Sequence, residues 1–157
     1  MHRRIKQLQR LAPWEQWMLL KLLVLLPAIG AALRLLDFHA TFGLIARSVP
    51  EAEARAGCGE ECPGEDIAHR IGRLVSIAAN HGPYRATCLR QSLALWWLLR
   101  RRRIPAELRI GVRKDNAGLR AHAWVELDGR ALNDPSGVCR TYAPFPRSSA
   151  VGALPLP

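Results

Sequence analysis

The stretch AHAWVELDGRALND, residues 121–134, carries the pattern that decides the fold. A period of two between apolar and polar positions is typical of a half-buried strand. Asp128–Gly129 interrupts that pattern with a hairpin-turn signal. The stretch therefore predicts two antiparallel strands joined at this turn. The two phases of the first strand are Ala121, Ala123, Val125 and Leu127 on one side and His122, Trp124 and Glu126 on the other.

Upstream of this stretch, the periodicity changes from strand-like to helical. Residues 108–113 alternate in the same way, but residues 14–48, 65–80 and 87–103 follow a helical repeat. We expect Pro27 or Gly30 to mark a break or kink in the first segment. The second segment has a core-facing stripe, and the third has Thr87 as its N-cap. Helices followed by an antiparallel sheet predict an α+β fold. The stripe of the second segment consists of Ile67, Ile71, Leu74, Val75 and Ala78.

The length of 157 residues is enough for one domain with a modest core. Within it we distinguish an apolar N-terminal helical segment at 1–50 and an acidic Pro/Gly linker at 51–64. A catalytic domain is expected at 65–147, followed by a loose tail at 148–157.

The N-terminal segment combines a basic start with an apolar run at residues 17–36, which is the order found in signal sequences. However, Lys21, Pro27 and Arg34 interrupt the run, and no clear cleavage site follows. These charges also argue against a membrane span. We expect a cytoplasmic protein with a buried helical pair, and peripheral membrane contact or a span stay open as alternatives.

The formal net charge of +10 calls for an anionic partner. Residues 85–120 hold ten Arg or Lys and only two acidic residues. An acidic peptide or protein could lie against this surface, or the surface could simply be solvated. Nucleic acid is not expected, because neither an aromatic platform nor a reading helix accompanies the arginines.

Four cysteines occur, at positions 58, 62, 88 and 139. Cys58 and Cys62 form a C-x3-C pair, but a zinc site would need two more ligands and only His69 is near. We interpret them as incidental thiols and expect neither a metal nor a cofactor.

Cys88 stands at the predicted start of a helix, where free backbone N–H groups and the helix dipole stabilise a thiolate. A thiolate is a nucleophile that needs a base, and imidazole is the usual one. His122 is the best candidate because it lies in the polar phase of its strand. His81 is a rival close in sequence, and a purely structural role for Cys88 in the core is the simpler alternative.

A third residue should orient the imidazole, and the hairpin register decides which one it is. A three-residue loop at 127–129 would place Asp134 across from His122 on the same face. A two-residue turn at Asp128–Gly129 would instead turn Asp134 away and put Asn133 on the same face as His122. We favour the three-residue loop, and hence Asp134.

Three blocks of this chain, CLRQSLAL at 88–95, RIPAELRIGVRK at 103–114 and the stretch at 121–134, resemble the lasso-peptide B proteins. The resemblance covers about residues 65–145. It implies a leader peptidase with a transglutaminase-like, papain-related fold and a Cys88–His122–Asp134 triad. Beyond the Cys88 backbone N–H, no oxyanion donor can be named. Gln91 and Arg103 depart from the family, which often has Arg and Gly there.

The resemblance also implies partners. The substrate would be a ribosomally made precursor peptide whose leader is cut from the core, after which an ATP-using lasso cyclase joins the new amine to an acidic side chain. The N-terminal 50 residues show no strand-rich recognition module, so a separate leader-recognition protein is expected. A non-catalytic scaffold that binds a peptide is the alternative function.

Overall fold

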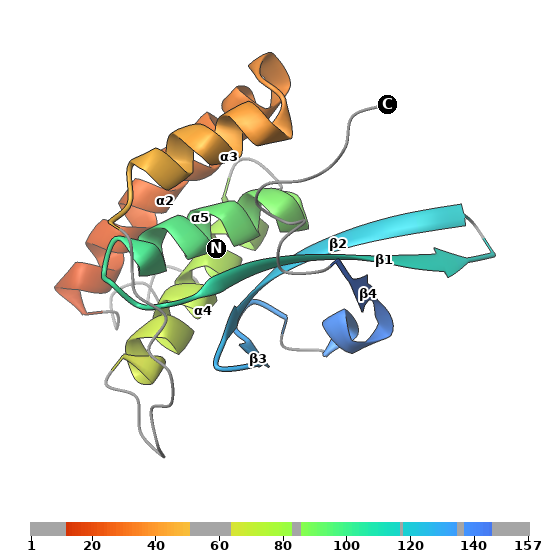
Figure 1. Ribbon diagram of the computed structural model, residues 1–157. Coiled ribbons are helices and arrows are strands. Elements are labelled where there is room, and N and C mark those ends of the chain that lie inside the picture. The colour runs from red at the N-terminus through yellow and green to blue at the C-terminus, as the bar shows by residue number, and fades with distance from the viewer. Residues whose placement is uncertain (1–11, 51–63, 83–85, 117, 135–136, 146–157) are drawn as a thin grey trace.

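The computed structural model describes residues 12–50, 64–82, 86–116, 118–134 and 137–145. Helices come first and an antiparallel sheet follows, which confirms the predicted α+β fold (Figure 1). In chain order the elements are α2 (Pro13–Leu35), α3 (Phe38–Arg47), α4 (Glu65–His81), α5 (Cys88–Arg100), β1 (Glu107–Asp115), β2 (Gly118–Leu127), β3 (Arg130–Ala131), the 3-10 helix η1 (Val138–Thr141) and β4 (Ala143–Pro144).

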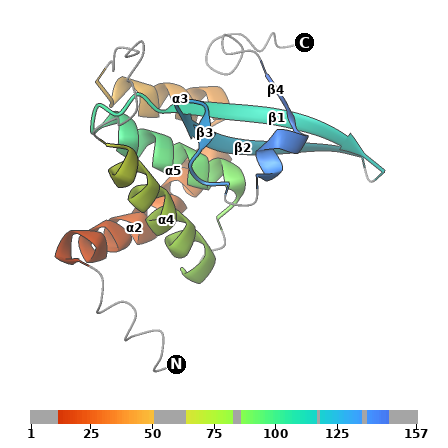
Figure 2. The same ribbon diagram turned by 90° about the horizontal axis from the view of Figure 1, so that it is seen from below.

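The sheet has the strand order β3-β2-β1-β4, and α5 packs against its two long central strands. Helices α4 and α2 pack in turn against α5, and α2 lies away from the sheet in both views (Figures 1 and 2). One continuous core joins these layers, from Leu22 of α2 through Leu93 of α5 to Val125 of β2, each fully buried. The N-terminal helices therefore share one core with the strands.

Helix α2 runs without a break from Pro13 to Leu35, so the expected break at Pro27 or Gly30 is wrong. Proline removes one backbone hydrogen bond, but Leu26 and Ile29 are buried on either side of it, and this burial holds the helix together. The break comes instead at Leu36–Asp37. The Asp37 side chain accepts a 2.7 Å hydrogen bond from the Ala40 N–H and so begins α3 as its N-cap.

The stripe predicted for residues 65–80 faces the core with one exception. Ile71, Leu74, Val75 and Ala78 are buried, but Ile67 is 47% exposed. Ile67 lies in the first turn of α4, where the neighbouring Ala68 takes the inward position with no exposure at all. The helix therefore turns its first apolar residue to solvent.

The hairpin between β2 and β3 has a two-residue turn, so the expected three-residue loop is wrong. Leu127 pairs with Arg130, leaving only Asp128 and Gly129 in the turn. Both have positive φ angles, 49° and 78°, as a type I′ turn requires, and Asp-Gly is a favoured sequence for it. This turn twists in the same sense as the flanking strands, which is why it is preferred over a longer loop.

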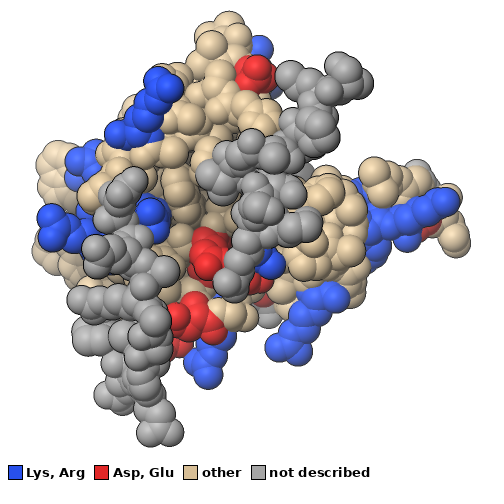
Figure 3. All heavy atoms as spheres, in the orientation of Figure 1, with Lys and Arg blue, Asp and Glu red and all other residues tan. Residues whose placement is uncertain are grey.

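Lysine and arginine side chains are scattered over the view in Figure 3, on the helical layer and on the projecting end of the β1–β2 hairpin, and a few acidic side chains lie near the centre. Arg100 and Arg109 are partly exposed, and Arg101, Arg102 and Arg103 are exposed.

Cys58, Cys62 and most of the expected linker lie outside the described residues, as does the expected tail.

A buried carboxylate fastens the start of α2 to α4. Glu15 accepts a 2.8 Å hydrogen bond from the Ala12 N–H and a 3.0 Å bond from Arg70 Nη2. The backbone bond from Ala12 lowers the pKa of Glu15, and Arg70 lowers it further, against an opposing effect of burial. A carboxylate with a lowered folded-state pKa stabilises the fold above its unfolded value near 4.5.

We therefore predict that this stabilisation is lost as the pH falls from about 4.5 through the lower folded-state pKa of Glu15. Urea unfolding between neutral and acidic pH should show it as a drop in the free energy of unfolding. Glu15→Gln should be less stable at neutral pH and should show a smaller drop. If the free energy of unfolding fell equally with pH in the wild type and in Glu15→Gln, Glu15 would not be the source of the pH dependence.

Candidate active site

Cys88 is the first residue of α5, with Thr87 as N-cap, as predicted. The Thr87 side chain makes no capping hydrogen bond to the described residues, and the first turn contains no acidic residue. The free N–H groups of this turn are thus available to a thiolate or an oxyanion. Gln91, one of the two departures from the lasso family, donates from Nε2 to the Ala86 carbonyl at 2.8 Å and fixes the chain that enters the helix.

His122 lies in the middle of β2, on the face opposite to the one that meets α5. Its side chain is 22% exposed and lies between two aromatic rings. The Trp124 ring is stacked at a centroid distance of 6.0 Å, and the Tyr142 ring is tilted at 5.2 Å. The imidazole is thereby confined on two sides.

The Trp124 ring is itself held in place. Its Nε1 donates to Glu126 Oε1 at 2.6 Å, and Arg109 Nε lies 3.5 Å from the other Glu126 oxygen. Gly111 pairs with His122 across the sheet, and a Cβ at Gly111 would lie 2.9 Å from the Trp124 ring. The absence of a side chain at Gly111 therefore makes room for the ring beside His122.

Asp134 lies next to the imidazole. Its Oδ2 is 3.8 Å from His122 Nε2, and its side chain is only 4% exposed. The Cys139 backbone N–H donates to the same oxygen and orients the carboxylate. A separation of 3.8 Å is too long for a hydrogen bond, and the buried Nε2 has no hydrogen-bond partner among the described residues. Catalytic contacts are often long in free enzymes and tighten when substrate binds.

A regular continuation of the two-residue hairpin would have put Asn133 rather than Asp134 on the face of His122. The ladder ends instead at Leu132, whose N–H donates to the Val125 carbonyl at 2.9 Å. The return bond, from the Val125 N–H, goes to Asn133 Oδ1 at 2.8 Å rather than to a backbone carbonyl. This side-chain substitution turns the chain out of the sheet, and Asp134 then faces His122.

Asn133 is also bonded to the nucleophile helix. Its Nδ2 donates to Ser92 Oγ at 2.9 Å, and Ser92 Oγ donates to the Ala123 carbonyl at 2.9 Å. Ser92 is completely buried. We call this pair of hydrogen bonds the Ser92–Asn133 bridge.

The bridge brings together the three segments that carry the predicted triad. Ser92 lies one helical turn after Cys88 and on the same face of α5. Ala123 follows His122 directly, and Asn133 directly precedes Asp134. The bridge therefore joins the start of α5, the middle of β2 and the end of the hairpin at a single buried point.

Comparison with protein families agrees with this arrangement. A profile of the transglutaminase-like superfamily matches residues 32–147. The chain belongs to the transglutaminase-like superfamily. Neither the curated proteins nor the solved structures yield a significant match. The transglutaminase-like superfamily includes cysteine peptidases, and its fold often carries a Cys-His-Asp site.

The other candidate residues occupy different places in this transglutaminase-like domain. His81 is exposed at the end of α4, where its Nδ1 lies 3.2 Å from the Ile77 carbonyl of the same helix. Cys139 is partly buried; burial raises the pKa of its thiol, and the hydrogen bond to Asp134 raises the pKa further. A thiol with a raised pKa is a poor nucleophile at neutral pH, so Cys139 can serve as a control for Cys88.

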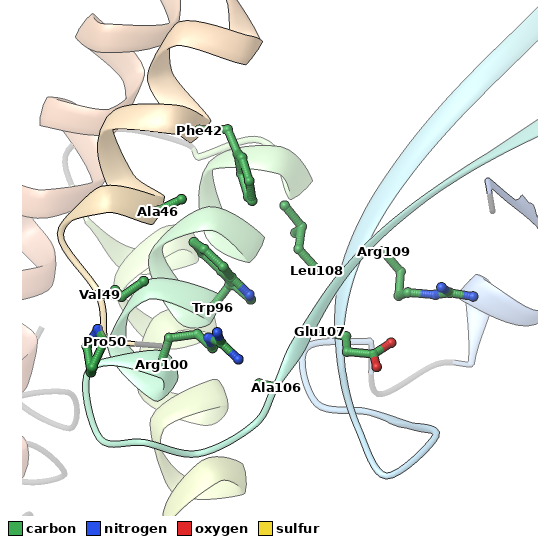
Figure 4. A pocket seen from close by; sticks show the side chains of 10 residues that line it. All are labelled: Phe42, Ala46, Val49, Pro50, Trp96, Arg100, Ala106, Glu107, Leu108 and Arg109. Carbon is green, nitrogen blue, oxygen red and sulfur yellow. The ribbon is translucent and has the colours of Figure 1, made fainter. Parts of the chain in front are cut away.

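Two cavities are relevant to substrate binding. A cleft of about 690 Å³ adjoins Asp134, Trp124 and Tyr142 and so borders the histidine site. A second cavity, of about 430 Å³, lies between α3, α5 and the start of β1 and contains no residue of the predicted triad (Figure 4). The first cleft is lined by Asp134 but by neither Cys88 nor His122, so it adjoins only one member of the predicted triad.

The sequence motifs do not identify several residues around the site. They assign no role to Ser92, Trp124 and Tyr142, and they offer Asn133 only as a rival of Asp134. Trp124 and Glu126 follow His122 at intervals of two, and this spacing was the available signal that they share its face. Tyr142 carried no comparable signal, because it lies after η1 in an irregular segment.

Proposed function

We propose that this protein is a cysteine peptidase that removes the leader from a lasso precursor peptide. The observation that carries the proposal is the Ser92–Asn133 bridge, which gathers the segments of Cys88, His122 and Asp134 at one point. Membership of a superfamily that includes cysteine peptidases supports the reaction class. The resemblance of three sequence blocks to the lasso-peptide B proteins supports the substrate.

In the proposed reaction, His122 takes the proton of the Cys88 thiol and the sulfur forms a bond to the scissile carbonyl carbon. His122 Nε2 points to Asp134, so Nδ1 is the nitrogen that would serve the thiol. The Asp134 carboxylate stabilises the imidazolium, as in other triads. The oxyanion would be bound by the Cys88 backbone N–H at the start of α5.

Collapse of this intermediate breaks the C–N bond, and the imidazolium gives its proton to the leaving amine. The leader remains on Cys88 as a thioester. Water then attacks the thioester carbonyl while His122 accepts one water proton and returns it to the sulfur. The products are the leader with a free carboxyl group and the core peptide with a new amine, which a separate ATP-using cyclase would use.

The proposal includes a separate leader-recognition protein and a location in the cytoplasm, where precursor peptides are made. The basic surface suits an acidic leader or an acidic partner. Arg101, Arg102 and Arg103 are exposed at the end of α5, and Arg120 is exposed on the β2 side of the projecting hairpin. Binding through these groups should weaken with added salt.

A non-catalytic scaffold is the second candidate. The observation that favours it is the 3.8 Å separation between His122 Nε2 and Asp134, which is longer than a hydrogen bond. A scaffold would bind the precursor without cutting it.

Mass spectrometry of the precursor, incubated with this protein and the recognition protein, separates the two functions. We expect a single cut at the leader–core junction, prevented by prior alkylation with iodoacetamide. In a competition for limiting iodoacetamide at neutral pH, Cys88 should react faster than Cys139, whose pKa is raised. A precursor that is bound but stays intact, together with equal alkylation rates, would favour the scaffold.

A further inference from the structure

Helix α2 has an apolar face that no described element covers. Its exposed positions follow intervals of three and four residues, so they lie on one side of the helix. Trp17 is 66% exposed, Val24 72% and Leu35 83%, which is unusual for side chains of this kind. We call this face the outer stripe; it consists of Trp17, Leu20, Val24, Ala28, Ala31 and Leu35.

The outer stripe runs along most of α2. From Trp17 to Leu35 it extends about 27 Å along the helix axis. By length and composition α2 could cross a membrane. However, its opposite face is part of the core, with Met18, Leu22 and Leu26 buried. Crossing would also separate Glu15 from Arg70, which are 3.0 Å apart. Helix α2 can therefore lie on a membrane without leaving the fold, but it cannot span one.

The two exposed charged residues within α2 that flank the outer stripe are both positive. Lys21 and Arg34 are exposed beside it, and the one acidic residue of α2, Glu15, is buried on the other side. The sequence before the helix adds further cations and no acidic residue: Arg3, Arg4, Lys6 and Arg10. An apolar helix face flanked by cations is the composition of helices that lie in the plane of anionic bilayers.

Two features of the outer stripe argue against a protein as its partner. Protein interfaces carry about one hydrogen bond per 100–200 Å², but none of the six side chains of the stripe except the Trp17 indole can form one. A second copy of the chain would bring another net charge of +10 against the same cations. Lipid acyl chains need no hydrogen bonds, and tryptophan is favoured at the membrane interface.

We propose that the outer stripe of α2 binds the protein to the surface of an anionic phospholipid bilayer. In this orientation α2 faces the lipid, and the sheet that carries His122 lies on the far side of α5 (Figures 1 and 2). The catalytic site thus stays accessible to a soluble peptide. This inference does not depend on the proposed peptidase activity.

Vesicle co-sedimentation of the full chain tests the proposal. The vesicles consist of phosphatidylcholine alone or of phosphatidylcholine mixed with phosphatidylglycerol. We expect binding to the anionic vesicles, weaker binding in high salt, and little binding to the neutral ones. The double variant Trp17→Ser, Val24→Ser should bind at least tenfold more weakly, with an unchanged circular dichroism spectrum.

Leu119→Ser is the matched control, because Leu119 is 73% exposed but lies in β2 at the tip of the projecting hairpin. It should bind vesicles as the wild type does. Lys21→Glu, Arg34→Glu keeps the outer stripe and should weaken binding to anionic vesicles only. Precursor cleavage, if present, should persist in all three variants when vesicles are omitted.

Three results would overturn the proposal. The first is equal vesicle binding by the wild type and the Trp17→Ser, Val24→Ser variant, which would place the contact elsewhere on the basic surface. The second is no vesicle binding together with a dimer that this variant abolishes, which would make the outer stripe a self-association surface. The third is no vesicle binding by the wild type together with a Trp17→Ser, Val24→Ser variant that no longer binds the recognition protein. This result would make the outer stripe a protein interface.

Discussion

Replacing His122 with alanine should slow cleavage of the precursor peptide roughly a hundredfold to ten-thousandfold. The variant lacks the group that takes the proton from Cys88 and later gives it to the leaving amine. His122 contacts the rings of Trp124 and Tyr142 and lies 3.8 Å from Asp134, so alanine would also remove the imidazole that adjoins this carboxylate. Single-turnover cleavage followed by mass spectrometry measures the loss.

His81→Ala is the matched control, because this second histidine binds only a carbonyl of its own helix in the described structure. It should cleave at the wild-type rate. Cys88→Ala should not cleave at all, whereas Cys139→Ala should retain cleavage. His122→Ala should also slow the alkylation of Cys88. Equal cleavage rates for His122→Ala and His81→Ala, or a slower rate for His81→Ala, would require a base other than His122.

Replacing Asn133 with alanine should reduce both stability and activity. The variant leaves the Val125 N–H without its acceptor and Ser92 Oγ without a donor. An unsatisfied buried group costs about 1 to 3 kcal/mol. Asn133 also holds the chain that presents Asp134, so kcat should fall even at temperatures where the variant is fully folded.

Urea unfolding and single-turnover cleavage of Asn133→Ala, Ser92→Ala and the double variant measure the two effects. Because the two side chains are bonded to each other, their effects should be non-additive. Asn80→Ala, at an exposed position of α4, should change neither quantity. Additive losses, or a folded Asn133→Ala with wild-type kcat, would show that the Ser92–Asn133 bridge does not position the site.

The sequence predicted the order of the elements well, because each long element has a clear repeat. Strands β1 and β2 alternate strictly, and α4 and α5 have regular apolar stripes. The end of α2 was harder to locate. Pro27 is a strong local signal for a break, but tertiary burial of Leu26 and Ile29 outweighed it. The true break depended on Asp37 as an N-cap, a signal that is short and occurs in many places.

The expected proximity of His122 and Asp134 is found, but the hairpin register from which it was expected is not. His122 and Asp134 do lie together, but the hairpin has the two-residue turn that seemed to favour Asn133. Counting positions along a strand assumes that the ladder continues. Here the Asn133 side chain replaces a backbone acceptor and ends the ladder. When a side chain takes the place of a backbone carbonyl as hydrogen-bond acceptor, the alternation of apolar and polar residues does not reveal it.

The position of α2 in the chain affects the order in which the fold can be completed. Its partner Arg70 follows Glu15 by 55 residues, and the chain is synthesised at about 5 to 20 residues per second. The helix therefore waits roughly 3 to 11 seconds for Arg70, and longer for the rest of α4 and for α5, which cover its inner side. During that interval the nascent chain carries a helix that is apolar on both sides, and only one of those sides is later covered by α4 and α5.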